Sequence, residues 1–297
     1  MTYGSATTAG HVAEYMRHIY GDRASAETIA DFEDRYARVG HSPLIEITLE
    51  QAEKLQASLG KDYVVRAGMQ HSAPFIEEAV GECKAAGAEK LVGIILAPQF
   101  SSFIMEGYRR TFHQAAEKHG FKPENLHLIG QWPAEPHFVE LLAGRTRRAL
   151  DGLTAKYGRP PAVAFTTHSL PERVVAQDPG YLDQLTATTE AVLAKLNEPN
   201  LEWYAAYQSA GHTPEPWLKP DLTDILAALH AKNHQAVLIV PIQFLTDHLE
   251  ILYDLDIAGG EQCREFELDY HRIELPNTDP LFIQALTALA TTGAGYN

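Results

Sequence analysis

Short, unbroken runs of Val, Ile, Leu and Ala recur along the chain and alternate with longer amphipathic stretches. Such apolar runs are typical of strands buried on both faces, and the stretches between them have the length and period of helices. The pattern therefore predicts an α/β fold in which parallel sheets are built from strand–helix–strand units. Strands are predicted over residues 63–68, 90–98, 125–130, 161–167, 202–208 and 235–242.

The two halves of the chain resemble each other weakly. Residues 90–103 (KLVGIILAPQFSSF) and 235–248 (QAVLIVPIQFLTDH) share a strand, a proline and Gln-Phe in the same order. This similarity predicts two related Rossmann-like halves, residues 1–143 and 144–275, with a final helix in 276–297 that packs back on the body. The alternative is that two strand–helix units look this similar by chance.

The charge balance argues against nucleic acid as a partner. Asp and Glu total 39 against 24 Lys and Arg, giving a formal charge of −15, whereas binding to phosphate backbones needs a clustered basic surface. An anionic small molecule is still compatible with this charge, because a few local arginines can hold one.

The chain has features of a cytoplasmic protein. Two cysteines are too few for a structural zinc site or an iron–sulfur cluster, and no signal peptide is recognisable. No run approaches the ~18 apolar residues that a membrane span needs. We therefore expect a cytoplasmic monomer without stable membrane insertion, prosthetic group or iron–sulfur cluster.

A histidine stands at the end of the predicted strand 161–167, in the segment FTTHSLPERV. In open α/β sheets, ligands bind beyond the carboxyl ends of the strands, so His168 is a candidate for chemistry. A purely structural role for a histidine at a strand end is the alternative.

Three carboxylates follow the predicted strand 235–242, in the segment TDHLEILYDLD. If that segment is an α-helix, Asp247, Glu250 and Asp254 fall at i, i+3 and i+7 on one face. Like charges in such a row repel each other, so a cation or a proton path along the face would explain them. A solvated acidic face is the alternative.

His168 and Glu250 are predicted just beyond the ends of neighbouring strands, which lie ~4.8 Å apart in a sheet. An imidazole and a carboxylate form a mixed nitrogen and oxygen site suited to ferrous iron or cobalt. The same two groups can also accept protons. The sequence leaves both roles open.

Other motifs exclude or suggest further functions. The chain has no GxGxxG after an early strand, no P-loop and no GxSxG elbow, so dinucleotide, nucleotide and serine-hydrolase sites are not indicated. The segment QSAGHTPEPWLKPD places Trp217 among three prolines, which suits a rigid wall for a flat ligand or a purely structural loop. DFEDRYARVGHSPL, with Arg35 and Tyr36, similarly could be an ordinary exposed helix end.

Several of these segments together resemble the ferrochelatase family. FTTHSLPE, QSAGHTPEPWLKPD and FLTDHLEILYDLD are similar to its long motifs, and DRYARVGHSPL, QHSAPFI and LAPQFSSF match in order over nearly the whole chain. The resemblance implies a lyase that inserts ferrous iron into a porphyrin in haem biosynthesis. It further implies two halves of the class II chelatase kind, with the porphyrin in a cleft between them, and iron as substrate.

The resemblance also assigns residues. His168 and Glu250 are implied as the catalytic and metal-binding pair, and Asp254 as a relay for protons or metal. Tyr3 matches a tyrosine of coproporphyrin-specific members and favours coproporphyrin III as substrate, with iron-coproporphyrin (coprohaem) as product. The implied porphyrin-binding residues are Tyr3, Arg35, Tyr36, Ser42 and Tyr108, and the implied cleft-wall residues are His71 and Trp217.

Some features depart from the family pattern. The family usually begins earlier, with an apolar strand that leads into Tyr-Gly; without it we expect a destabilised N-terminal half and a poorly held Tyr3. Ala258 stands where many members continue the acidic row with Glu. Tyr20-Gly21-Asp22 replaces expected basic residues.

Three alternatives remain for the function. They are a protoporphyrin IX ferrochelatase, a cobalt or nickel chelatase of the sirohydrochlorin type, and a non-catalytic haem-binding protein.

Overall fold

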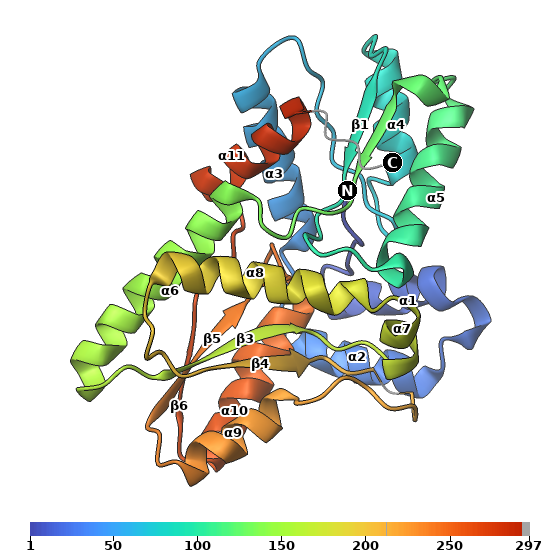
Figure 1. The fold of residues 1–297 in the computed structure, drawn as a ribbon. Coiled ribbons are helices and arrows are strands. Elements are labelled where there is room, and N and C mark those ends of the chain that lie inside the picture. Colours follow the sequence, from blue (N-terminus) through green and yellow to red (C-terminus); the bar gives the residue numbers. More distant parts are fainter. Residues whose placement is uncertain (212, 293–297) are drawn as a thin grey trace. The chain divides into compact units, whose positions relative to one another are not determined.

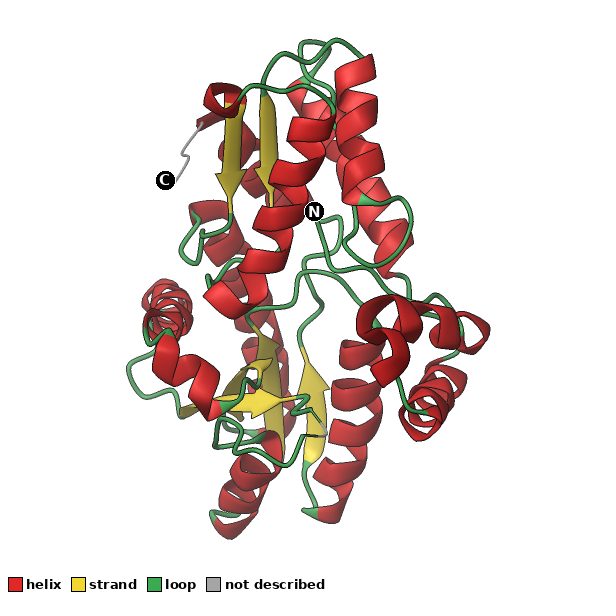
Figure 2. Ribbon diagram, turned by 90° about the vertical axis from the view of Figure 1, so that its right-hand side faces the viewer, coloured by secondary structure: helices red, strands yellow, loops and turns green. Residues whose placement is uncertain are grey.

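Both halves of the chain are α/β structures with parallel strands, as the alternation of apolar runs and amphipathic stretches predicts (Figures 1 and 2). The computed structural model describes residues 1–211 and 213–292. The chain forms two compact units: unit 1 comprises residues 1–132, 246–249 and 277 onward, and unit 2 comprises residues 133–245 and 250–276.

Unit 2 contains a four-stranded parallel sheet in the order β4-β3-β5-β6. Every residue of β5, and all of β3 except His168, is buried, which explains why these central strands are mostly apolar. The predicted strands 161–167, 202–208 and 235–242 are confirmed. The strands are β3 (Ala162–His168), β4 (Trp203–Gln208), β5 (Ala236–Pro241) and β6 (Asp269–Arg272).

One face of this sheet packs against α9, α10 and a π-helix. Ala164, Leu226, Ile239 and Leu255 are among the buried side chains of that core. Two further helices of this unit, α6 and α8, pack against each other, and α6 also contacts β5. The helices of unit 2 are α6 (Pro136–Tyr157), α7 (Glu172–Gln177), α8 (Gly180–Leu196), α9 (Leu222–Ala231), the π-helix η4 (Glu250–Gly259) and α10 (Gly260–Glu265).

Helix α6 begins where its sequence signals it. The Glu135 carboxylate accepts a hydrogen bond from Phe138 N–H at 2.7 Å. Pro136 occupies the first helical position, where a backbone N–H would have no partner within the helix. The predicted boundary at residue 143 lies inside this helix, and unit 2 instead begins at residue 133.

Unit 1 contains a parallel pair of strands, β1 (Leu91–Ile94) and β2 (Leu126–Ile129), within the predicted ranges 90–98 and 125–130. Ile76, Val80 and Phe112 of α4 and α5 form a buried core with Ile95, next to β1. Helix α11 contacts α3 and β1 within this unit. The helices are α1 (Val12–Tyr20), α2 (Ala26–Val39), α3 (Leu44–Leu59), α4 (Ile76–Ala85), α5 (Ser102–Lys118) and α11 (Pro280–Thr292), with single 3₁₀ turns at Ala9–His11, Gly21–Arg23 and Pro123–Asn125.

The strand predicted over residues 63–68 is not a regular strand, and this part of the prediction is wrong. The first residues of the chain pair with its end: Thr2 N–H donates to Gly68 O at 3.2 Å, and Gln70 N–H donates to Thr2 O at 3.0 Å. These first residues also bond to the end of β1, because the Met1 amino group donates to Ile94 O at 2.6 Å.

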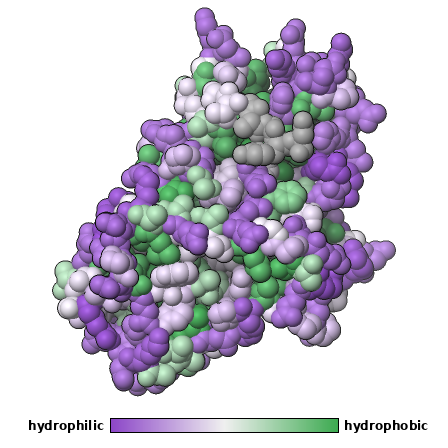
Figure 3. Space-filling model, in the orientation of Figure 1, coloured by the Kyte–Doolittle hydropathy of each residue, from purple (hydrophilic) through white to green (hydrophobic). Residues whose placement is uncertain are grey.

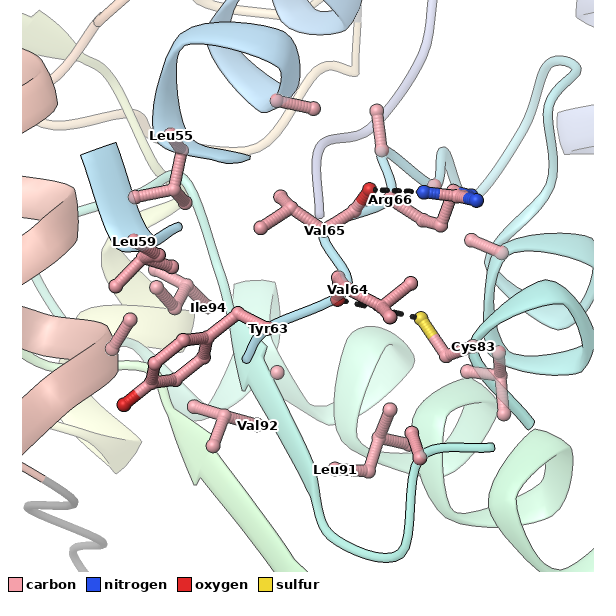
Figure 4. A pocket seen from close by; sticks show the side chains of 18 of the residues that line it. Leu55, Leu59, Tyr63, Val64, Val65, Arg66, Cys83, Leu91, Val92 and Ile94 are labelled. Atoms are coloured by element: carbon pink, nitrogen blue, oxygen red, sulfur yellow. Dashed lines mark hydrogen bonds between the residues drawn. The ribbon is translucent and has the colours of Figure 1, made fainter. Parts of the chain in front are cut away.

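A cavity of about 810 Å³ lies in unit 1 beside these first residues (Figure 4). Apolar side chains dominate its labelled lining, among them Leu55, Leu59, Val65 and Val92. Met1 also lines this cavity, and burial lowers the pKa of its amino group to about 5.

The surface of the molecule is mostly hydrophilic in the view of Figure 3, with smaller apolar areas between the polar side chains. Among the described helices, none is both long and apolar enough to cross a membrane.

Candidate active site

His168 is the last residue of β3, as predicted, and the backbone carbonyl of the next residue, Ser169, orients its ring. Its Nδ1 lies 2.5 Å from Ser169 O. Because a carbonyl oxygen can only accept, Nδ1 carries the proton, and Nε2 of the neutral ring presents its lone pair. That nitrogen lies 3.7 Å from a carboxylate oxygen of Glu250. The imidazole and the carboxylate are 29% and 38% exposed, so both are accessible to a ligand.

Glu250 is the first residue of the π-helix Glu250–Gly259, whereas the sequence predicted an α-helix. Hydrogen bonds from i to i+5 widen the helical turn, and such segments often occur at functional sites. The predicted row of three carboxylates on one face is therefore wrong. Asp247 precedes the helix and hydrogen-bonds to Asn277 instead, while Glu250 and Asp254 remain on the helix.

Asp254 is held by the end of the neighbouring strand. Its carboxylate accepts a hydrogen bond from Ser209 Oγ, directly after β4. Ser209 has φ of +56°, a left-handed conformation that few side chains adopt readily. In the register of the sheet, His168 pairs with Gln208, so unit 2 brings His168, Glu250 and Asp254 to the carboxyl ends of β3 and β4.

Polar side chains that the sequence did not single out also hold the site. The Gln243 amide oxygen accepts the His168 backbone N–H at 2.9 Å, and its nitrogen donates to Tyr181 Oη at 2.8 Å. This buried bridge fixes the end of β3 against the loop after β5. The Gln-Phe that both halves share contains Gln243, so the internal similarity was a signal that could have revealed it.

Two further polar groups lie on the same strands. Thr166 is fully buried and Gln208 is 6% exposed, and neither the hydroxyl nor the side-chain amide has a hydrogen-bond partner among the described residues. Buried polar atoms of this kind usually bind water or a ligand.

The Pro-rich loop is tied to the segment after His168. Leu218 N–H donates to Leu170 O at 3.0 Å, and Trp217 bridges Pro171 in an antiparallel contact. Gly211 is required here, because a Cβ at that position would lie 2.8 Å from the Trp217 ring. Trp217 is therefore held against the segment that follows His168. The neighbouring residue 212 lies outside the described residues.

Tyr3 is one of the most exposed large side chains of unit 1, at 43%. Its ring centroid lies 4.4 Å from that of His71, and Tyr3 O accepts the His71 backbone N–H at 2.9 Å. Gly4, with φ of +95°, allows the turn: a Cβ there would lie 2.4 Å from Ser72 Oγ. Burial, and secondarily the neighbouring charge of His18, lower the pKa of His71 to about 4, so this ring is neutral at pH 7.

The other predicted porphyrin residues lie mostly below the surface. Ser42 and Tyr36 are buried and both bond to Ser5 Oγ, at 2.9 and 2.8 Å. Tyr108 is also buried, which raises its pKa. Arg35 is partly exposed and pairs with Asp31 at 3.0 Å. Of this set, Tyr3 and Arg35 are the ones within easy reach of a ligand.

Two α/β units with parallel sheets are the architecture of the class II chelatases. The fold is similar to that of SirB from Bacillus subtilis with Fe³⁺, with a TM-score of 0.56, 13% identity and coverage of 82% of this chain and 87% of that one. It is also similar to CbiX, the terminal enzyme for biosynthesis of siroheme in denitrifying bacteria, with a TM-score of 0.52, 12% identity and coverage of 83% and 91%. At these identities the likeness concerns the fold alone.

The chain belongs to the ferrochelatase family, whose model matches residues 1–294. It is 37% identical to a ferrochelatase of Herpetosiphon aurantiacus, over 98% of this chain and 96% of that protein. It is 34% and 35% identical to coproporphyrin III ferrochelatases of a Geobacillus species and of Anoxybacillus flavithermus, over 97% of this chain and 94% and 93% of theirs. The protein is accordingly a metal chelatase, a lyase, as predicted.

Proposed function

We propose that this enzyme inserts Fe²⁺ into coproporphyrin III, giving iron-coproporphyrin, with His168 and Glu250 as the catalytic and metal-binding pair. The observation that carries the proposal is the 3.7 Å separation between His168 Nε2 and the Glu250 carboxylate at the exposed end of β3. Nitrogen and carboxylate oxygen ligands suit ferrous iron, and two protein ligands leave other coordination positions to the porphyrin nitrogens or water.

The reaction exchanges two pyrrole N–H protons for one Fe²⁺ ion. Nε2 of His168 can accept a proton because the Ser169 carbonyl keeps the other proton on Nδ1. Glu250 then stabilises the imidazolium electrostatically, since an opposite charge within ~4–6 Å favours the charged form. Asp254, anchored by Ser209, is the next carboxylate on the π-helix and is proposed as the relay that passes protons or metal onward.

The substrate assignment is supported by Tyr3 and by the names of the similar proteins. Coproporphyrin III carries four propionates where protoporphyrin IX carries two propionates and two vinyl groups. Tyr3 presents a phenol on the surface of unit 1, and Arg35 presents a guanidinium that can pair with a carboxylate. The monomeric state, the cytoplasmic location and the absence of a prosthetic group remain predictions.

An anaerobic insertion assay with both porphyrins tests the substrate. The enzyme is mixed with Fe²⁺ and either coproporphyrin III or protoporphyrin IX, and the loss of the free-base absorption bands is followed. We expect turnover with coproporphyrin III and little with protoporphyrin IX. Faster turnover of protoporphyrin IX would contradict the substrate assignment, and haem binding without any turnover would favour the haem-binding alternative, with Tyr3 as an axial ligand.

Replacing Tyr3 with phenylalanine tests the role of its hydroxyl. If this group contacts the substrate or the iron, Tyr3→Phe should lower kcat/KM for coproporphyrin III by roughly 2- to 10-fold, the effect of one hydrogen bond. Tyr63→Phe is a matched control, because Tyr63 is 41% exposed in the same unit and lines the cavity away from Tyr3. Equal effects of the two substitutions would remove Tyr3 from the proposal.

A further inference from the structure

The residues directly before Glu250 are held within unit 1 by hydrogen bonds to side chains that are far away in the sequence. Asn277 Oδ1 accepts the Asp247 backbone N–H at 2.9 Å, and Asn277 Nδ2 donates to the Asp247 carboxylate at 2.7 Å. Gln51 Nε2 of α3 donates to Thr246 Oγ1 at 3.2 Å and to Asn277 O at 2.8 Å. The Asn277 amide thus holds Asp247 at two points, and the Gln51 amide contacts both Thr246 and Asn277.

The supporting end of this network is buried, and Asp247 and Asn277 are partly buried. Gln51 is 2% exposed and Thr246 is 5% exposed. Breaking a buried hydrogen bond on one side leaves the other group unsatisfied, so these contacts hold their partners firmly. Asn277 has φ of +47°, a left-handed conformation that Asn and Asp tolerate better than most residues, which matches the residue type to the position.

Part of this network lies just before Glu250 in the sequence. Only His248 and Leu249 separate the fastened Asp247 from Glu250, and Leu249 is buried at 6%. Glu250 begins the π-helix, and its carboxylate lies 3.7 Å from His168 Nε2. Glu250 thus follows the fastened Asp247 by three residues in the chain.

We propose that Asn277 and Asp247 form a clamp that positions Glu250 for metal insertion, with Gln51 as its support. None of the three is a catalytic residue; they act through the chain. The inference rests on the proposed function of the His168–Glu250 pair. It extends the functional set to residues that supply neither a metal ligand nor a proton acceptor.

Exchanging the two side chains separates positioning from simple stability. Asn277→Asp places two carboxylates at the 2.7 Å contact, where like charges repel, so the clamp should open. In the double variant Asp247→Asn with Asn277→Asp, the amide and the carboxylate have changed places and both hydrogen bonds can form again. Asn277→Asp should lower kcat about 10- to 100-fold, as misplacement by ~1 Å does, with KM for porphyrin changed less than about twofold. The double variant should recover kcat to within about threefold.

The pH dependence of kcat tests the contact between residues 247 and 277 in a second way. In Asn277→Asp, lowering the pH protonates one of the two facing carboxyls and allows one to donate to the other, so kcat relative to the unmodified enzyme should rise toward acid pH. Thr287→Ala is the matched control, because it removes a 2.8 Å side-chain bond between α11 and Ser58 of α3 and leaves the clamp untouched. Its kcat should be unchanged. Thermal unfolding of every variant shows that each is folded at the assay temperature.

Binding of Co²⁺, a spectroscopic substitute for Fe²⁺, provides a readout besides turnover. Asn277→Asp should weaken Co²⁺ binding at the His168–Glu250 pair at least fivefold, and the exchange should restore it. Unchanged kcat and Co²⁺ affinity in folded Asn277→Asp, or an exchange that restores neither, would overturn the clamp. If the unmodified enzyme binds Co²⁺ at the pair without inserting iron, the proposed function fails, while the Co²⁺ affinities still decide for or against the clamp.

Discussion

Replacing His168 with alanine is expected to abolish iron insertion and to leave porphyrin binding intact. The substitution removes the Nε2 lone pair and leaves Glu250 without its partner at 3.7 Å. A positioned general base contributes about 10²- to 10⁴-fold to rate, and this residue is also proposed as a metal ligand, so the loss should lie at or beyond the upper end of that range. Anaerobic insertion rates and fluorescence titration with coproporphyrin III measure the two properties separately.

His137 provides a matched control in the same unit. It also forms a histidine–carboxylate pair, with Nδ1 2.8 Å from a Glu135 oxygen, but at the start of α6 and not at a strand end. His137→Ala should keep a nearly normal rate. A His168→Ala enzyme that retains more than about a tenth of the rate, or a His137→Ala enzyme that loses as much as His168→Ala, would show that the wrong histidine has been assigned.

The free energy of unfolding of the 297-residue chain with a free Met1 amino group should increase from pH 5 to pH 8. Burial lowers the pKa of this group to about 5 in the folded state, from 8.0. Between these values the unfolded chain binds more protons, so raising the pH favours the folded state. A shift from 8.0 to about 5 corresponds to a contribution on the order of 4 kcal/mol. Denaturant unfolding at a series of pH values measures it.

Extending the chain ahead of Met1 should remove the part of this dependence that comes from the amino group, and His71, whose pKa is lowered from 6.5 to about 4, should still contribute below pH 6.5. In an extended chain the buried ammonium becomes a peptide N–H, which is uncharged at any of these pH values. The backbone of Met1 and Thr2 already pairs in parallel with β1 and with the segment after residue 63, so an added extended segment of four to six residues would continue along the cavity. If its residues are Val, Ile and Leu, they also bury apolar surface there, worth about 25 cal/mol per Å².

A polar extension of equal length that contains proline is the control, because it removes the charge but cannot pair as a strand or fill the cavity. We expect both extensions to flatten the pH dependence between 6.5 and 8, above the range in which His71 contributes, and only the apolar one to add stability. An unmodified chain whose stability is independent of pH between 6.5 and 8 would contradict the burial of the amino group. Equal stability of the two extended chains would show that the cavity does not accept a strand.

The central strands and the proximity of His168 and Glu250 could be predicted because each depends on local sequence. β3 and β5 are buried on both faces, so their sequences are rich in apolar residues, and His168 stands at the end of one of them. Parallel strands place their carboxyl ends together, which makes a contact between His168 and Glu250 a consequence of topology. The short, polar β6 (Asp269–Arg272) has no such signal, because an edge strand need not be apolar.

What could not be predicted depends on partners distant in sequence. Asp247 fits a helical face by its spacing, yet it bonds to Asn277, thirty residues later, and leaves the row. Tyr36 and Ser42 read as exposed polar residues near a helix end, but Ser5 Oγ completes their hydrogen bonds inside unit 1. The π-helix likewise has no local pattern that distinguishes it from an α-helix.

The most direct test of the proposed role of His168 in iron insertion is a single turnover on a preformed enzyme–porphyrin complex. Unmodified enzyme saturated with coproporphyrin III is mixed anaerobically with Fe²⁺ in a stopped-flow instrument, beside His168→Ala at equal porphyrin occupancy. We expect the free-base bands to disappear rapidly with the unmodified enzyme. With the variant they should be lost only as slowly as they are for porphyrin in buffer. Loss of the bands at the same rate in both proteins would show that iron enters the porphyrin without His168.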